Sequence, residues 1–138
     1  MKKTKRIALC LMMAVLMFSS FAITAMAANG SGSVVAGNTR YPYNWSISCS
    51  STEGVANIST TDSPAAVKAS AFNYLYSEIN DAYGYGSTKA VTGYGTVTSK
   101  PSTILTINGV NVPLCEVVQT TATFHVAGQF VLTATEAA

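Results

Sequence analysis

The N-terminal segment 1–27 has the pattern of an export signal, and this pattern constrains what the remainder of the chain can fold into. The basic side chains at its start are Lys2, Lys3, Lys5 and Arg6. An apolar stretch over 7–23 follows, and Ala25-Met26-Ala27 then gives the small-x-small pattern that signal peptidase cleaves. A transmembrane anchor is the alternative, but two serines interrupt the apolar stretch, which barely reaches bilayer-spanning length. We therefore predict a signal peptide over 1–27 and a mature chain that begins at Ala28.

Removal of the signal changes the sign of the net charge. The whole chain has eight basic and six acidic residues, for a net charge of +2. Four of the basic residues lie in the signal, so the mature chain has a net charge of 4 − 6 = −2. Binding to nucleic acid or to an anionic membrane requires clustered lysine and arginine, and we expect neither partner. The lysine-rich signal favours a bacterial source, and we expect release into the medium.

The cysteines are consistent with export. Cys10 lies in the signal, which leaves Cys49 and Cys115 in the mature chain. Because an isolated pair in an oxidising compartment usually forms a bond, we predict a disulfide between them. It would close the long loop from 49 to 115, and the chain-entropy treatment values closure of a loop of that size at about 4 kcal/mol. A reactive thiol is the alternative, and it would need a lowered pKa and a nearby base.

The mature chain, 28–138, has the size of a single domain. We expect a flexible lead-in over 28–40, with a short strand at Val34-Val35, and one domain over 41–138. Several segments predict strands. Alternation is clearest over 43–51, where Tyr43, Trp45, Ile47 and Cys49 share one face. The other predicted strands are 55–60, 90–99, 103–107, 110–114, 116–126 and 129–135, with hairpin turns at Asn108-Gly109 and Ala127-Gly128.

Between these strands the pattern predicts one helix over 63–83. Ser63 can cap it, Pro64 suits its first position, and Gly84 or Gly86 can end it. Apolar side chains recur at steps of three and four residues: Ala65, Ala69, Phe72, Leu75, Tyr76, Ile79 and Tyr83. We therefore predict an α+β fold in which this helix packs on one face of an antiparallel sheet of five to seven strands. A small β-sandwich with a helical insertion is the alternative.

The sequence contains few of the residue patterns that enzymes use for catalysis. His125 is the only histidine, so metal sites built on paired histidines are excluded, and we predict no metal and no cofactor. A secreted hydrolase that uses His125 with Glu116 or Asp62 and a serine is an alternative, but no glycine-flanked nucleophile turn is present. Glu78 and Asp81 offer at most a weak cation site. We therefore predict that the protein is not an enzyme.

Aromatic residues give the better indication of a site. Tyr83, Tyr85 and Tyr94 have glycine neighbours, and Tyr41 precedes the first strand. Glycine beside an exposed tyrosine leaves the ring open for stacking on a sugar or gripping a peptide. The alternative is that these glycines serve turns and close packing. We predict a small secreted, monomeric binding module for a protein or a cell-wall glycan; a structural component of a surface or matrix is a further alternative.

Overall fold

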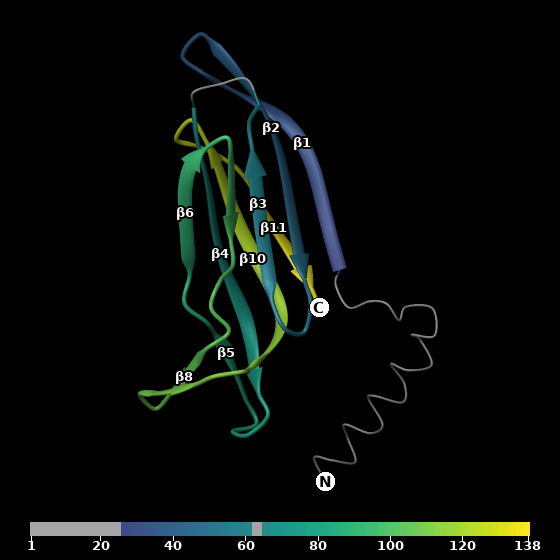
Figure 1. The fold of residues 1–138 in the computed structure, drawn as a ribbon, viewed down its shortest axis with the longest axis vertical. Helices are drawn as coiled ribbons and strands as arrows, with labels where there is room; N and C mark the ends of the chain where they lie inside the picture. The colour runs from purple at the N-terminus through teal and green to yellow at the C-terminus, as the bar shows by residue number, and fades with distance from the viewer. Residues whose placement is uncertain (1–25, 62–64) are drawn as a thin grey trace, which may run out of the picture.

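The computed structural model describes residues 26–61 and 65–138, and these residues form eleven strands and no helix (Figure 1). The predicted signal peptide up to Ala25, and the predicted helix cap at Ser63 and Pro64, lie outside the described residues. All the paired strands among these residues run antiparallel.

Sheet A has four strands in the order β1-β2-β3-β7, all antiparallel. Their bounds are Met26–Ala36 for β1, Thr39–Cys49 for β2, Gly54–Ser59 for β3 and Thr96–Ser99 for β7. Every residue of β1 pairs with β2, from Met26 opposite Cys49 to Ala36 opposite Thr39. The segment 28–40, which the sequence suggested as a lead-in, therefore belongs to this pair and its turn.

Sheet B is built around β4 and β10 and has the order β11-β10-β4-β5, with β6 also paired to β4. The bounds are Ala66–Ser77 for β4, Ala82–Tyr85 for β5, Lys89–Tyr94 for β6, Glu116–Val126 for β10 and Gln129–Ala137 for β11. A small separate hairpin consists of β8, Leu105–Ile107, and β9, Val110–Val112. β5 and β6 thus act as one interrupted edge strand along β4.

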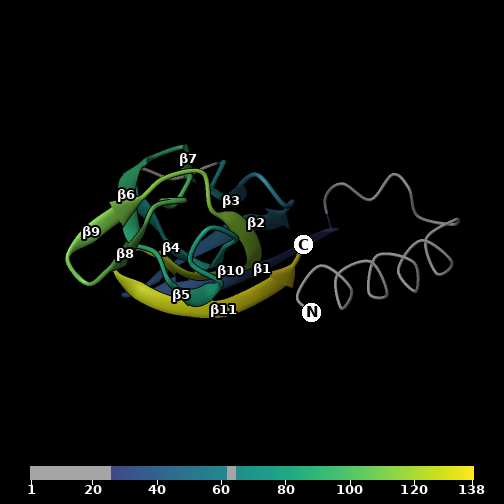
Figure 2. The same cartoon turned by 90° about the horizontal axis from the view of Figure 1, so that it is seen from below.

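Sheets A and B pack face to face as a sandwich. Seen end-on, β7 and β3 lie on one side and β11 on the other (Figure 2). The main core draws buried side chains from both sheets: Ile47, Ala56, Ile58, Val67, Ala69, Ala71, Val97, Ala122, Phe124 and Val126. Trp45 packs against this core with its ring centroid 5.9 Å from that of Phe124. The two apolar inner faces therefore supply the surface that each sheet must bury.

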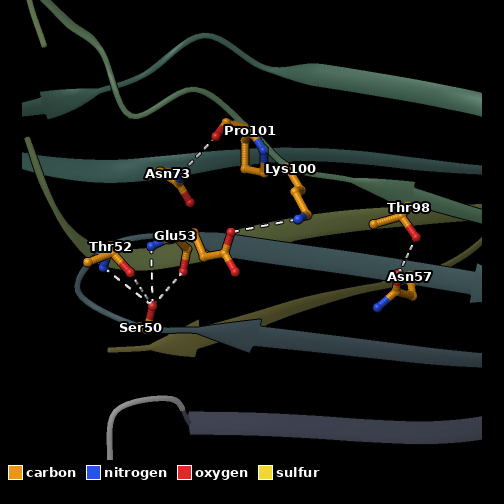
Figure 3. Close-up of polar contacts among 8 residues, drawn as sticks. All are labelled: Ser50, Thr52, Glu53, Asn57, Asn73, Thr98, Lys100 and Pro101. Carbon is orange, nitrogen blue, oxygen red and sulfur yellow. Dashed lines mark hydrogen bonds and ion pairs between the residues drawn. The ribbon is translucent and has the colours of Figure 1, made fainter. Parts of the chain in front are cut away.

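The predicted α+β fold is wrong, because 66–77 within the predicted helix is strand β4 and 82–85 is strand β5. Burial along β4 alternates strictly, with odd-numbered residues from Val67 to Ser77 buried and even-numbered residues half-buried. Asn73 is completely buried, but its side chain is satisfied. Its amide donates a 3.2 Å hydrogen bond to the carbonyl oxygen of Pro101 (Figure 3) and another of 3.2 Å to that of Ser102. Its side-chain oxygen accepts a hydrogen bond of 2.7 Å from Thr120. Because the polar residue Asn73 lies on the inner face, the sequence of β4 does not show the alternation of apolar and polar residues that would identify a strand.

Several local predictions are confirmed. The predicted strands over 43–51 and 55–60 are β2 and β3, which pair with each other. Both predicted turn pairs have left-handed backbone, with φ of 51° and 77° at Asn108-Gly109 and 52° and 77° at Ala127-Gly128. The predicted strand over 90–99 is two strands instead. Gly95, with φ of 79°, separates β6 in sheet B from β7 in sheet A. A residue with a side chain would be strained in this conformation.

Candidate functional site

The outer face of sheet B carries a row of aromatic side chains. Because successive side chains of a strand point to opposite faces, the buried residues of β4 leave Phe72, Tyr74 and Tyr76 on the outside. In the adjacent strand, Tyr85 lies opposite Tyr74 and Tyr83 lies opposite Tyr76. Both strands therefore present aromatic rings to the same surface at the same level.

These five residues form one continuous series of ring contacts, which we call the aromatic ladder. The centroid distances are 5.6 Å for Phe72–Tyr85, 5.0 Å for Tyr85–Tyr74, 5.6 Å for Tyr74–Tyr83 and 4.7 Å for Tyr83–Tyr76. All four distances lie within the range of favourable aromatic pairs. The ladder follows the strand direction, and the four residue steps from Phe72 to Tyr76 span about 13 Å.

On the side of β5 away from the ladder, Gly84 packs against Leu105 of β8. A Cβ atom on Gly84 would lie 2.6 Å from Cδ1 of Leu105, so β5 packs directly against β8 at this point. Leu105 itself is buried. The rings on either side of Gly84 face outward, and Tyr83 is 61% exposed and Tyr85 69% exposed. Their ring faces are thus accessible from solvent.

The turn between β4 and β5 holds the Tyr76 end of the ladder through a hydrogen bond. The hydroxyl of Tyr76 donates a 2.7 Å hydrogen bond to Oδ1 of Asp81, which has a left-handed φ of 47°. Within the turn, the Ser77 hydroxyl donates to Oδ1 of Asn80 at 3.1 Å and accepts from the Asn80 backbone at 3.3 Å. Short polar side chains stabilise such turns by bonding to the nearby backbone.

Uncharged polar side chains lie beside the ladder on β10 and β11. Opposite Ser70, Phe72 and Tyr74, strand β10 places Thr123, Thr121 and Gln119. The hydroxyls of Thr121 and Thr123 each form a 3.2 Å hydrogen bond with a threonine of β11, Thr135 and Thr133 respectively. The middle of this face therefore offers aromatic rings and hydroxyls without formal charge.

The structure brings together two of the four predicted aromatic residues. Tyr83 and Tyr85 belong to the ladder. Tyr94 is 72% exposed but lies at the far end of β6, opposite Ala66. Tyr41 lies on β2 and packs against the main core from within the sandwich. Of the predicted ligand-contacting residues, these last two are not part of the ladder.

Sequence reasoning missed Phe72, Tyr74 and Tyr76 as surface residues, because it assigned two of them to the buried side of a helix. A signal was nevertheless present. Aromatic residues occupy every second position over 72–76 and again over 83–85. A period of two in aromatic residues is typical of one face of a strand.

His125 lies on the outer face of β10, opposite Lys68 of β4. Its ring packs edge-on against Phe130 with centroids 6.0 Å apart, and its Nδ1 atom is buried without a hydrogen-bond partner. Glu116 lies at the other end of the same strand, which corresponds to a separation of about 30 Å. Asp62 lies outside the described residues. The structure thus gives His125 no orienting carboxylate from Glu116.

Cys49 and Cys115 are both buried and free. Within residues 26–61 and 65–138 there is no group of three or more histidine, cysteine, aspartate or glutamate side chains that could bind a metal ion. The same residues contain no helix with the length and apolar character needed to cross a membrane.

Comparison of the chain with known proteins found no matching family model, no similar curated protein and no similar solved structure. Functional inference therefore rests on the chemistry of the surface itself.

Proposed function

We propose that this protein is a small secreted, non-catalytic module that binds a cell-wall polysaccharide through the aromatic ladder. The ladder is the observation that supports the proposal. Tyr83 and Tyr85 expose their ring faces, and Phe72, Tyr74 and Tyr76 extend the series along the strand. Pyranose rings have apolar C–H faces that stack on aromatic rings, and their hydroxyls need hydrogen-bond partners beside the stack.

Two of the three β10 side chains opposite the ladder are uncharged, with Glu116 opposite Tyr76 as the exception, and this favours a neutral sugar chain over an anionic ligand. The side chains of β10 opposite the ladder include Thr121 and Gln119, which donate and accept hydrogen bonds without a charge. A ladder of about 13 Å along one strand direction suits an extended polymer better than a compact molecule. The expected ligand is therefore an extended, uncharged stretch of polysaccharide, and export would place the protein where such polymers occur.

The proposal is tested by sedimentation of the secreted protein with insoluble polysaccharides. The probes are purified peptidoglycan, chitin and cellulose. We expect retention by at least one of them, and we expect Tyr83→Ala and Tyr85→Ala each to weaken it. Loss of one stacking ring costs about 1 kcal/mol, which is about fivefold in affinity.

Tyr94→Ala is the matched control, because Tyr94 is at least as exposed as either ladder residue but lies outside the ladder. It should bind like the wild-type protein. Binding to none of the three polymers, or equal binding by the wild type and both ladder variants, would contradict the proposal.

A further inference from the structure

The two free cysteines lie in the same small hydrophobic cluster, although they come from distant parts of the chain. Cys49 ends β2, and Cys115 immediately precedes β10. The cluster consists of Cys49, Leu75, Leu105, Cys115 and Val117. Cys49 is fully buried and Cys115 nearly so. Both thiols are thus enclosed among apolar side chains at the end of the sandwich where β8 packs.

Backbone hydrogen bonds join the two segments that carry these thiols. The Val117 amide donates to the Ser51 carbonyl at 2.9 Å, so each cysteine lies two positions before one partner of this bond. The segment after Cys49 is itself ordered, because the Ser50 hydroxyl accepts hydrogen bonds from the Thr52 and Glu53 amides (Figure 3). The chain around Ser51 and the chain around Val117 are therefore already adjacent without any covalent bond.

The backbone next to Cys115 is strained. Leu114 has a left-handed φ of 57° and is 94% exposed. A bulky residue in this conformation is strained, and an apolar side chain gains nothing from such exposure. Pro113, on the other side of Leu114, has no amide hydrogen to donate. Cys115 follows the strained Leu114, and its thiol donates a hydrogen bond to the Val112 carbonyl at 3.2 Å.

Free reactivity of Cys49 is disfavoured in the folded protein. Burial raises the pKa of the Cys49 thiol above its usual value, although a hydrogen bond with Thr120 opposes this shift. A thiol kept protonated reacts slowly with external oxidants or electrophiles. Oxidation of this pair therefore belongs to folding, before the cluster closes around it.

We propose that Cys49 and Cys115 are joined by a disulfide as the exported chain folds. Each thiol loses its proton, one sulfur–sulfur bond forms, and two electrons pass to the disulfide of an extracytoplasmic thiol–disulfide oxidoreductase, which becomes a dithiol. The bond fastens the end of β2 to the segment before β10 and encloses the whole loop between 49 and 115. This inference is independent of the proposed polysaccharide binding.

The first test is mass spectrometry on protein from fresh culture supernatant, denatured in iodoacetamide with and without prior reduction. The expected result is no carbamidomethyl group without reduction and two after it. Two such groups without reduction would overturn the proposal, because both thiols would then be free in the native protein.

The second test is thermal unfolding with and without dithiothreitol, for the wild type and for Cys49→Ala/Cys115→Ala. Reduction should lower the wild-type Tm by on the order of 10 °C and should leave the double variant unchanged. A wild-type Tm that does not respond to full reduction would contradict a stabilising disulfide. If the double variant does not fold, the wild-type comparison and the mass measurement still decide.

Discussion

Gly54 shows how little room the inner faces of the sandwich leave for a side chain. It is buried at the start of β3, and a Cβ atom there would overlap Oγ1 of Thr120 and Oδ1 of Asn73. Those two atoms form the buried hydrogen bond between β10 and β4. A methyl group at Gly54 must therefore either break this hydrogen bond or push the two sheets apart.

We expect Gly54→Ala to lower the free energy of unfolding by about 2 to 3 kcal/mol through overpacking. Urea denaturation followed by tryptophan fluorescence measures this, since Trp45 is the only tryptophan. Gly109→Ala is the contrasting variant. Its Cβ would meet open space, and only the left-handed φ is unfavourable, so we expect a cost of about 1 kcal/mol. Equal effects of the two variants would contradict a steric role for Gly54.

At the scale of elements, hairpins were predictable and the identity of β4 was not. Asn108-Gly109 and Ala127-Gly128 are local signals, because two residues determine each turn. β4 depends on partners far away in sequence, since the carbonyls that satisfy Asn73 come from Pro101 and Ser102. Without them, a buried Asn and outward Phe and Tyr residues resemble a helix period. The candidate site was predicted only in part for the same reason. The sequence identified Tyr83 and Tyr85 as site residues, but not the rings of β4.

The hairpin of β8 and β9 depends on one anchor. Leu105 is buried in the hydrophobic cluster that contains Cys49 and Cys115, and it lies against Gly84 of β5. We expect Leu105→Ala to cost about 2 to 4 kcal/mol and to increase amide hydrogen exchange first in 105–112. Val110→Ala is the control, because Val110 is an exposed side chain of the same hairpin. Uniform loss of protection across sheets A and B would show that the hairpin is not a separate unit.

At the scale of the whole molecule, the sequence predicted a sandwich only as the alternative and with a helical insertion, because the arrangement depends on which strands meet. The predicted strand over 90–99 contributes to both sheets, and Gly95 is the position where it passes from one to the other. The periodicity of a strand shows which side chains share a face, but it does not show which strands pair with one another. Net charge still gives a prediction at this scale, namely that the protein binds neither nucleic acid nor an anionic membrane.

Binding by the aromatic ladder should depend little on salt. Between about 0.01 M and 1 M ionic strength the screening length falls from about 30 Å to about 3 Å, which suppresses attraction between exposed charges. The rings and the β10 residues opposite Phe72 and Tyr74 are uncharged, and Glu116 lies only at the Tyr76 end. We therefore expect the affinity for the bound polysaccharide to change by less than about threefold over this range. Sedimentation isotherms at several salt concentrations measure it. A steep loss of binding with added salt would indicate that charged residues such as Lys68 carry the interaction.

All five rings of the ladder come from 72–85, one continuous piece of chain that folds back on itself. Recognition surfaces on sandwich domains often gather their residues from several separate loops. Here the whole platform is encoded in one short stretch. It is therefore suited to transplantation onto an unrelated antiparallel scaffold, and a few codon changes would alter every ring in it.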